Sequence, residues 1–150
     1  MKWIYKNNEV PDSKPNFFGF VYLIEYTDNT FYIGKKSFYS MNTLKPLKSG
    51  EQRLNGTFFN KIVNHKVVQM ESVRTESNWR NYIGSSKKTK HLRVRRKVML
   101  QVYEDKLNLT FGELEWMIKC DVLRNKMYHN DNVAGKYFVG KINRELKWKK

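Results

Sequence analysis

Cysteine is nearly absent from the sequence, with Cys120 as its one example, and Cys and His residues do not cluster in the way that zinc sites require. An internal disulfide is therefore excluded, and Cys120 is interpreted as a small buried hydrophobic residue. Long hydrophobic runs are also absent. None approaches the roughly 18 residues that a membrane-spanning helix needs, and the N-terminus lacks a signal-peptide pattern. We expect an intracellular, cytoplasmic protein with no membrane partner.

Acidic residues are scarce relative to basic ones. The 150 residues include 14 Asp and Glu against 29 Lys and Arg, which gives a formal net charge of +15. An excess this large in a compact domain favours a polyanionic partner, most often nucleic acid, although a merely soluble basic surface has the same composition. Hydrophobic residues make up 40% of the chain, which suffices for the core of one folded domain and excludes a disordered chain.

Residues 17–38 predict a β-hairpin, because two runs rich in aromatic and β-branched residues flank the turn-forming pair Asp28-Asn29. We predict a loop with an odd number of residues, in which Asn29 takes the left-handed conformation. With that register, Tyr22 and Tyr32 point to the same side of the sheet. A two-residue turn would place them on opposite faces.

Two short triplets in this hairpin resemble the paired signature of the GIY-YIG nuclease family. Tyr32-Ile33-Gly34 matches the second triplet outright, whereas Phe20-Val21-Tyr22 has phenylalanine where the family name has glycine. The order hairpin, helix, strand, helix and asparagine-bearing segment across roughly residues 17–135 is similar to the family layout. Residues 76–87 and 128–135 resemble its phage-type branch, which is often grouped with homing-like endonucleases.

The resemblance implies an α/β (α+β) fold with a small three-stranded central sheet flanked by helices. We expect an N-terminal arm over residues 1–16 that packs Trp3 against the domain, a nuclease domain over 17–135, and a basic C-terminal tail over 136–150. Residues of about 39–76 are predicted to form an inserted β-hairpin that projects from the core. This insertion is either a nucleic-acid contact or a plain surface hairpin.

Local patterns predict the shorter elements. Residues 57–63 and 66–73 predict the hairpin of the insertion, joined by a turn at Asn64-His65. Ser77 is a favourable N-cap for a short helix over residues 78–83. Alternating apolar and basic residues predict a strand, at least over residues 97–103.

A capping box of Thr110 and Glu113 predicts a helix that runs to about Asn125. Its expected apolar stripe consists of Leu114, Met117, Ile118 and Val122. Glu115 lies beside this stripe. It is either a glutamate of the helix surface or a carboxylate directed into a site.

The family resemblance implies a set of catalytic residues for phosphodiester hydrolysis. Tyr22 would deprotonate or position the attacking water, supported by Tyr32, and surrounding cations would lower the pKa of Tyr22. Glu115 would hold one Mg²⁺ or Mn²⁺ through oxygen. Arg80 would bind the scissile phosphate. The alternatives to Arg80 are Lys36, Lys87 and Arg93.

Further nucleic-acid contacts are expected around these residues. A late asparagine of the family helps to hold DNA or the site, and Asn132 fits this role best, with Asn130 second. Ser85, Ser86, Lys87 and Lys88 combine hydroxyl groups with cations, a composition suited to phosphate. The remaining expected contacts are Gly34, Lys35, Arg93 and Lys136.

We therefore predict a metal-dependent endonuclease that hydrolyses phosphodiester bonds in double-stranded DNA. A non-catalytic basic nucleic-acid-binding protein on the same fold is the alternative, and an RNA-directed or ribosome-associated protein is a third class. The enzymatic hypothesis requires Glu115 to lie on the same side of the molecule as Tyr22.

Overall fold

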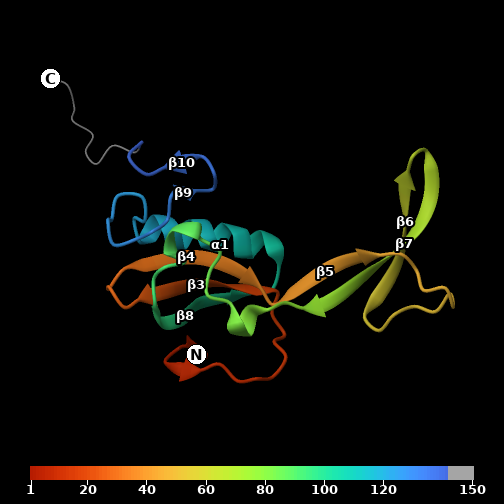
Figure 1. Ribbon diagram of the computed structural model, residues 1–150, viewed down its shortest axis with the longest axis horizontal. Helices are drawn as coiled ribbons and strands as arrows, with labels where there is room; N and C mark the ends of the chain where they lie inside the picture. The colour runs from red at the N-terminus through yellow and green to blue at the C-terminus, as the bar shows by residue number, and fades with distance from the viewer. Residues whose placement is uncertain (142–150) are drawn as a thin grey trace.

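The computed structural model describes residues 1–141, and at its centre is a five-stranded sheet with the order β2-β1-β8-β3-β4 (Figure 1). β3 is antiparallel to both of its neighbours, and β1 runs parallel to β8. The expected three-stranded sheet is therefore too small. The five strands are β1 (Trp3–Tyr5), β2 (Asn8–Glu9), β3 (Gly19–Tyr26), β4 (Phe31–Ser37) and β8 (Val94–Tyr103).

The N-terminal segment supplies the two additional strands. The expected packing of Trp3 is confirmed, since its side chain is 1% exposed. The indole N–H of Trp3 donates a hydrogen bond of 2.7 Å to the carbonyl of Trp79, and its ring packs edge-on against Phe20. The segment is thus part of the core.

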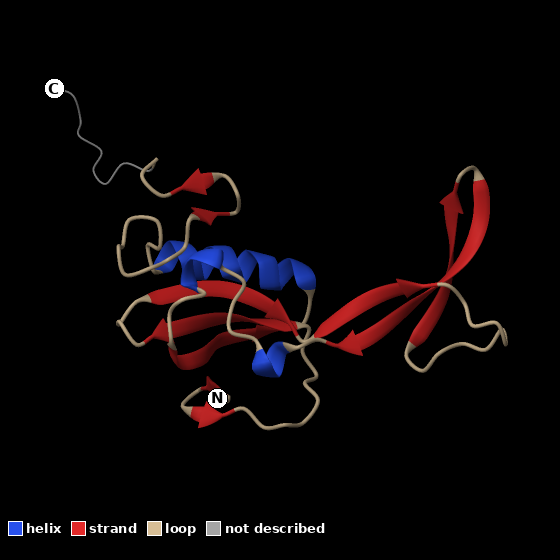
Figure 2. Cartoon of the chain, viewed as in Figure 1, coloured by secondary structure: helices blue, strands red, loops and turns tan. Residues whose placement is uncertain are grey.

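One helix, α1 (Lys106–Lys119), covers one face of the central sheet (Figure 2). A core of six buried residues lies on the side of the helix: Val21, Ile33, Leu109, Met117, Val122 and Val133. A second core, rich in aromatic residues, lies on the opposite face. Its buried members are Trp3, Phe20, Tyr22, Ile24, Tyr26, Phe38, Trp79 and Met99.

The predicted odd-numbered hairpin loop is confirmed. The N–H of Tyr26 donates to the carbonyl of Thr30 at 2.9 Å, which closes a three-residue loop, and Asn29 has a φ of 62°. Asparagine tolerates this left-handed conformation better than most residues. Tyr22 and Tyr32 consequently lie on the same face of the sheet.

Helix α1 begins earlier than the capping box predicts. Asp105 is its N-cap and accepts a hydrogen bond of 2.8 Å from the N–H of Asn108, so Thr110 lies inside the helix. Leu114, Met117 and Val122 of the expected stripe pack in the core on the helix side, whereas Ile118 is 64% exposed. The buried residues of the helix are Leu109, Gly112 and Met117.

The predicted strand at 97–103 is confirmed, but its alternation is broken by a bulge. Gln101 pairs with Val21 and Met99 pairs with Tyr22, which leaves Leu100 without a partner on β3. An extra residue of this kind reverses which side chains face each side of the sheet. Lys97, which falls among the polar positions of the sequence pattern, is therefore buried in the aromatic core.

The helix predicted over residues 78–83 is wrong. The segment forms a single 3₁₀ turn, η1 (Trp79–Asn81), followed by a second, η2 (Lys87–Thr89). The Ser77 hydroxyl donates to the carbonyl of Ser37 at 2.6 Å instead of capping a helix. The segment is thereby tied to the end of β4.

The insertion is a three-stranded sheet that projects from the end of β4 (Figure 1). We call this sheet the arm; it is distinct from the N-terminal segment of residues 1–16. Its strands are β5 (Tyr39–Leu44), β6 (Gly56–Val63) and β7 (Lys66–Glu76). The predicted second hairpin is confirmed. Its two turn residues, Asn64 and His65, have φ values of 49° and 63°, as a tight two-residue hairpin turn requires.

The chain after α1 returns along the outer edge of β4 and ends in a small ladder. This ladder pairs β9 (Asn132–Val133) with β10 (Tyr137–Phe138). Most of the expected basic tail, from residue 142 onward, lies outside the described residues. Among residues 1–141, no helix is long and apolar enough to cross a membrane.

Candidate functional site

The two tyrosines of the hairpin meet near the edge strand β4. Tyr22 pairs with Gly34, and Ile24 pairs with Tyr32, so the two phenol rings are neighbours on one face. Their ring centroids are 6.3 Å apart. Tyr22 is buried, whereas Tyr32 is half-buried and lines a hollow of about 760 Å³.

Gly34 makes room for the ring of Tyr22. A Cβ atom at residue 34 would lie 2.4 Å from the Tyr22 hydroxyl oxygen and 2.7 Å from the carbon that carries it. Any larger residue would therefore displace the phenol. The close approach expected at Gly34 exists, but Tyr22 makes it.

A third phenol, Tyr82, completes the cluster and was missed by the sequence analysis. Its hydroxyl oxygen lies 3.5 Å from that of Tyr22, and the two rings are 5.7 Å apart. The ammonium group of Lys36 sits 4.4 Å from the centre of the Tyr82 ring and donates to Asn78 at 2.7 Å. The only sequence signal for Tyr82 is its place within the family-like segment 76–87.

Lys97 holds the segment that carries Tyr82. It is 2% exposed, and its ammonium group donates to the carbonyls of Arg80 at 2.8 Å and Tyr82 at 3.3 Å. The same group lies 4.6 Å from the ring of Trp3. Burial lowers the pKa of Lys97, because desolvation disfavours its charged form.

The tyrosine pKa values move opposite to the sequence-based expectation. Burial raises the pKa of Tyr22 above its ordinary value, and Tyr82, Tyr32 and Glu113 raise it further. Burial likewise raises the pKa of Tyr32. Both groups therefore keep their protons at neutral pH in this state, and a phenolate at Tyr22 is disfavoured.

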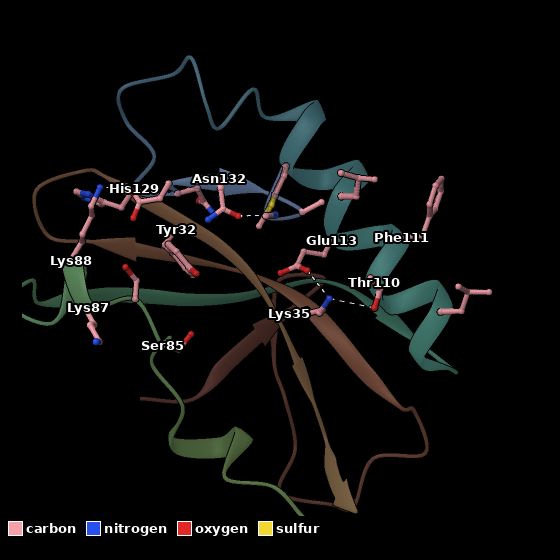
Figure 3. A pocket seen from close by; sticks show the side chains of 18 residues that line it. Tyr32, Lys35, Ser85, Lys87, Lys88, Thr110, Phe111, Glu113, His129 and Asn132 are labelled. Atoms are coloured by element: carbon pink, nitrogen blue, oxygen red, sulfur yellow. Dashed lines mark hydrogen bonds and ion pairs between the residues drawn. The ribbon is translucent and has the colours of Figure 1, made fainter. Parts of the chain in front are cut away.

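Glu113 is the helix carboxylate that reaches the tyrosine site. It lines the hollow together with Tyr32, and its carboxylate forms an ion pair of 2.8 Å with the ammonium group of Lys35 (Figure 3). Lys35 also donates to the Thr110 hydroxyl at 3.3 Å. Tyr32 belongs to the aromatic face of the sheet and Glu113 to the helix on the other face, so the edge at β4 is where the two faces meet.

Glu115 does not reach this hollow, so its assignment as the metal-binding carboxylate is corrected. The cutting mechanism predicted from the sequence, which required Glu115 on the side of Tyr22, does not hold. Glu115 is exposed and is not among the residues that line the hollow. On the β8 side, burial raises the pKa of Tyr103, and the charge of Glu115 raises it further. Residues two apart on a helix point about 200° away from each other. Because α1 begins at Lys106, Glu113 is on the β4 side of the helix and Glu115 on the β8 side.

Arg80 is also directed elsewhere. Its guanidinium pairs with Glu76 at 2.9 Å and Asp12 at 3.6 Å and stacks on Trp79 at 4.4 Å. It lines a separate hollow beside Met1. The 3₁₀ turn at this place, in contrast to the expected helix, turns the side chain toward the N-terminal segment. Arg80 therefore does not meet the tyrosines.

The side of the hollow across from Glu113 is formed by the expected hydroxyl and lysine run. Ser85, Ser86, Lys87 and Lys88 line it. In Figure 3, Tyr32 lies between this run and Glu113. Lys88 forms an ion pair with Asp131. The hollow thus presents hydroxyl and ammonium groups opposite Glu113, and its second carboxylate, Asp131, is paired with Lys88.

Asn130 and Asn132, the two asparagines expected to help hold DNA or the site, make different contacts. Asn130 is 3% exposed, and its side-chain amide pairs with the backbone of Ile33 as a neighbouring strand would. It donates to the Ile33 carbonyl at 2.8 Å and accepts from the Ile33 N–H at 3.1 Å. These bonds fix the loop to the outer edge of β4. Asn132 also lines the hollow, where its side chain accepts from the N–H of Gly135 at 3.0 Å.

The remaining predicted contacts lie outside the main hollow. Lys36 is beside Tyr82, and Gly34 is buried beneath Tyr22. Arg93 is exposed next to the hairpin loop, where its carbonyl accepts from the N–H of Thr27 at 3.0 Å. Lys136 is exposed directly after the loop residues that line the hollow.

The groups of the hollow that could hold a hard divalent cation are the carboxylates of Glu113 and Asp131. Among residues 1–141, no three His, Cys, Asp or Glu side chains gather around one point. Mg²⁺ is commonly bound through only one or two carboxylates, with phosphate oxygens and water completing its shell. Glu113 is such a carboxylate, with a side chain 21% exposed, and the ammonium of Lys35 already balances its charge.

Comparison with known proteins identifies one family. The family model described as putative endonuclease segE, GIY-YIG domain, matches residues 3–138. The match includes the N-terminal strands, the arm and the loop with Asn130. Neither the curated proteins nor the solved structures give a match.

Proposed function

Because the chain belongs to the GIY-YIG endonuclease family, of the phage-type kind, we propose that it is a metal-dependent nuclease that cuts double-stranded DNA. The proposed cofactor is Mg²⁺ or Mn²⁺. The observation that carries the proposal is the meeting of Glu113, Lys35 and Tyr32 in one hollow. It combines a carboxylate for a metal, a cation for phosphate and a phenol for a water or oxygen.

The hydroxyl and lysine run opposite Glu113 binds the phosphate backbone. Lys87 and the hydroxyls of Ser85 and Ser86 would hold the phosphate next to the scissile bond, as such groups do in protein–DNA contacts. Lys35 would release Glu113 and turn to a phosphoryl oxygen, where its charge stabilises the transition state. This assigns to Lys35 and Lys87 the function that the sequence suggested for Arg80.

Glu113 would hold the cation. When bound there, the metal would supply Lewis-acid stabilisation of the phosphoryl charge and lower the pKa of a bound water. The pairing of Glu113 with Lys35 keeps the carboxylate oriented toward the hollow before substrate and metal arrive. Substrate phosphate would complete the shell around the metal, so metal and DNA would bind cooperatively.

Tyr32 is the phenol that lines the hollow, and Tyr22 is buried next to Tyr32 without lining the hollow. Because burial raises their pKa values, both would act through a retained proton, as hydrogen-bond donors that orient the attacking water or the phosphate. Tyr22 and Tyr82 would fix the ring of Tyr32. This exchanges the roles first expected for Tyr22 and Tyr32.

Incubation of supercoiled plasmid with the full chain tests the proposed function. We expect relaxed or linear plasmid with Mg²⁺ or Mn²⁺, and no conversion after chelation with EDTA, because the phosphoryl charge then has no metal to balance it. Plasmid that is bound but uncut with every divalent metal would support the non-catalytic nucleic-acid-binding alternative. Cleavage of RNA in preference to DNA would contradict the substrate class.

A further inference from the structure

A second hollow leads from the catalytic site to the root of the arm. It has a volume of about 430 Å³ and shares Lys35 and Thr110 with the main hollow. Its lining also includes Lys36, Lys106, Tyr39 and Ser77. No carboxylate lines it among the described residues. A passage with three lysines and several hydroxyl groups is suited to a phosphate backbone.

The arm continues this chemistry on one of its faces. Because side chains alternate along a regular ladder, the pairings of β7 with β5 and β6 place Tyr39, Phe59, Lys61, Lys66 and Arg74 on the same side. We call this side the basic face of the arm. Its three cations are exposed, and none has a carboxylate within 4.0 Å among residues 1–141. Arg74 stacks on the ring of Tyr39 at 3.8 Å.

At the root of the arm, the opposite face is covered and electrically balanced. Glu71 points to that side, is fully buried, and pairs with Arg53 of the connection between β5 and β6. The backbone N–H of Arg53 also donates to Glu71 at 2.5 Å. Residues 57–70 contain no Asp or Glu. The distal hairpin therefore presents positive charge, and only its root is stiffened by a buried ion pair.

We propose that the arm binds duplex DNA beside the cleavage site, with the hairpin β6–β7 in the major groove and the second hollow holding the backbone between. The inference rests on the proposed function and names how that function would engage its substrate. A two-stranded ribbon fits the major groove of B-form DNA, which is about 12 Å wide. At roughly 3.3 Å per residue, eight residues of β6 extend over about 26 Å, enough to follow the groove.

The exposed apolar side chains of the hairpin fit this occupant. Ile62 and Val67 face each other near the turn, on the side of the ribbon opposite Lys61 and Lys66, and are 73% and 70% exposed. With the tip of the hairpin in the major groove, Ile62 and Val67 on one side of the ribbon would meet the methyl groups of thymine, while Lys61 and Lys66 on the other side would meet phosphates of the groove wall. The charge of the face favours a polyanion over a second copy of this basic chain, which carries +15 itself.

Binding of the full-length chain to a fluorescent DNA duplex of about 40 base pairs, without divalent metal, tests the proposal. The variant K61A/K66A removes two charges from the basic face. The matched control K45A/K48A removes two charges from the connection that covers the other face. We expect K61A/K66A to bind roughly tenfold more weakly, and the slope of the logarithm of its binding constant against the logarithm of salt concentration to be shallower by about two. The affinity of the control should change by no more than about twofold.

An RNA duplex of the same sequence provides the second comparison. Its A-form major groove is deep and narrow, so a ribbon cannot enter it, and K61A/K66A should bind it as the unchanged chain does. Equal losses for both double variants, or equal losses on DNA and RNA, would overturn the proposal. A change of oligomeric state in sedimentation with unchanged DNA affinity would make the arm a protein interface instead.

Failure here is distinguishable from failure of the proposed function. Binding is measured without metal, and cleavage of plasmid is scored separately. An uncut plasmid together with binding that depends on Lys61 and Lys66 would contradict only the nuclease. Cleavage together with binding that ignores both lysines would contradict only the role of the arm. The melting temperatures of the variants confirm that each still folds.

Discussion

Glu113→Gln is expected to lower the rate of plasmid cleavage by about a thousandfold, because a metal that balances phosphoryl charge contributes several kcal/mol to the transition state. The amide keeps the size of the side chain but loses the charge that binds Mg²⁺. It also loses the ion pair with Lys35, which is partly exposed and contributes little to stability. The melting temperature should therefore stay near that of the unchanged chain.

Glu115→Gln is the matched control, because Glu115 lies two residues after Glu113 on the same helix. It removes the same charge from an exposed place on the other side of α1. Cleavage should stay within about twofold, as for most surface substitutions. If Glu115→Gln abolished cleavage and Glu113→Gln did not, the metal would lie on the β8 side of the helix, and the site described above would be wrong.

Removal of the hydroxyl group of Tyr32 or of Tyr22 is expected to lower cleavage about a hundredfold, the scale of a lost proton-bearing contact in a transition state. Neither change should weaken the fold. The hydroxyl of Tyr22 has one hydrogen-bond neighbour, at the long distance of 3.5 Å, so its loss costs less than about 1 kcal/mol of unfolding free energy. Cleavage assays and urea denaturation of Y22F and Y32F measure both effects.

Tyr26→Phe is the control for these two variants. Tyr26 lies on the same strand and the same face, is 1% exposed, and its hydroxyl has no hydrogen-bond partner within the described part of the chain. It does not line the hollow, so cleavage should be unchanged. Since burial raises the pKa of Tyr22, the rate should show no step between about pH 6 and 9 that Y22F abolishes. Such a step would show that Tyr22 acts as a phenolate base.

The local sequence predicted the parts of the fold that turn chemistry controls. Asn29 in the left-handed conformation fixes the three-residue loop, and that loop alone places Tyr22 and Tyr32 on one face. The same holds for the turn at Asn64-His65, where both residues have positive φ. In each case the information lies within a few neighbouring residues, which is why it could be read without the structure.

The parts that failed depend on contacts between distant segments. Strand β1 has three residues, too few for a visible alternation, and exists because Trp3 reaches the carbonyl of Trp79. The bulge at Leu100 reversed the alternation of β8 and buried Lys97. Neither feature leaves a local signal.

The carboxylate was misplaced because the sequence does not show which side of α1 faces β4. Asp105 and Thr110 are both acceptable N-caps, and the end of β8 at Tyr103 decides for Asp105. With Ile118 and Val122 counted in the apolar stripe, Glu115 borders it. With the helix as observed, Glu113 borders it and reaches Lys35. The residue type and the element were predictable, but the rotation of the helix was not.

The departure from the family signature at Phe20 has a structural reason. Phe20 is fully buried, and its ring lies 5.0 Å from Trp3 and 4.8 Å from Phe38. Its large side chain joins the N-terminal strands to the end of β4, where the arm begins. A glycine here would leave a void in the aromatic core, so phenylalanine suits a domain that carries these two additions.

The central claim is that Glu113 and the tyrosines share one metal-binding hollow at the edge of β4. Paramagnetic broadening of amide NMR signals by Mn²⁺ tests it most directly, because the effect reports distance from the metal and needs no cleavage. We predict broadening around Tyr32, Ser86 and Glu113 that is lost in Glu113→Gln and kept in Glu115→Gln. Broadening centred on Glu115 and Tyr103, or unaffected by Glu113→Gln, would contradict the account.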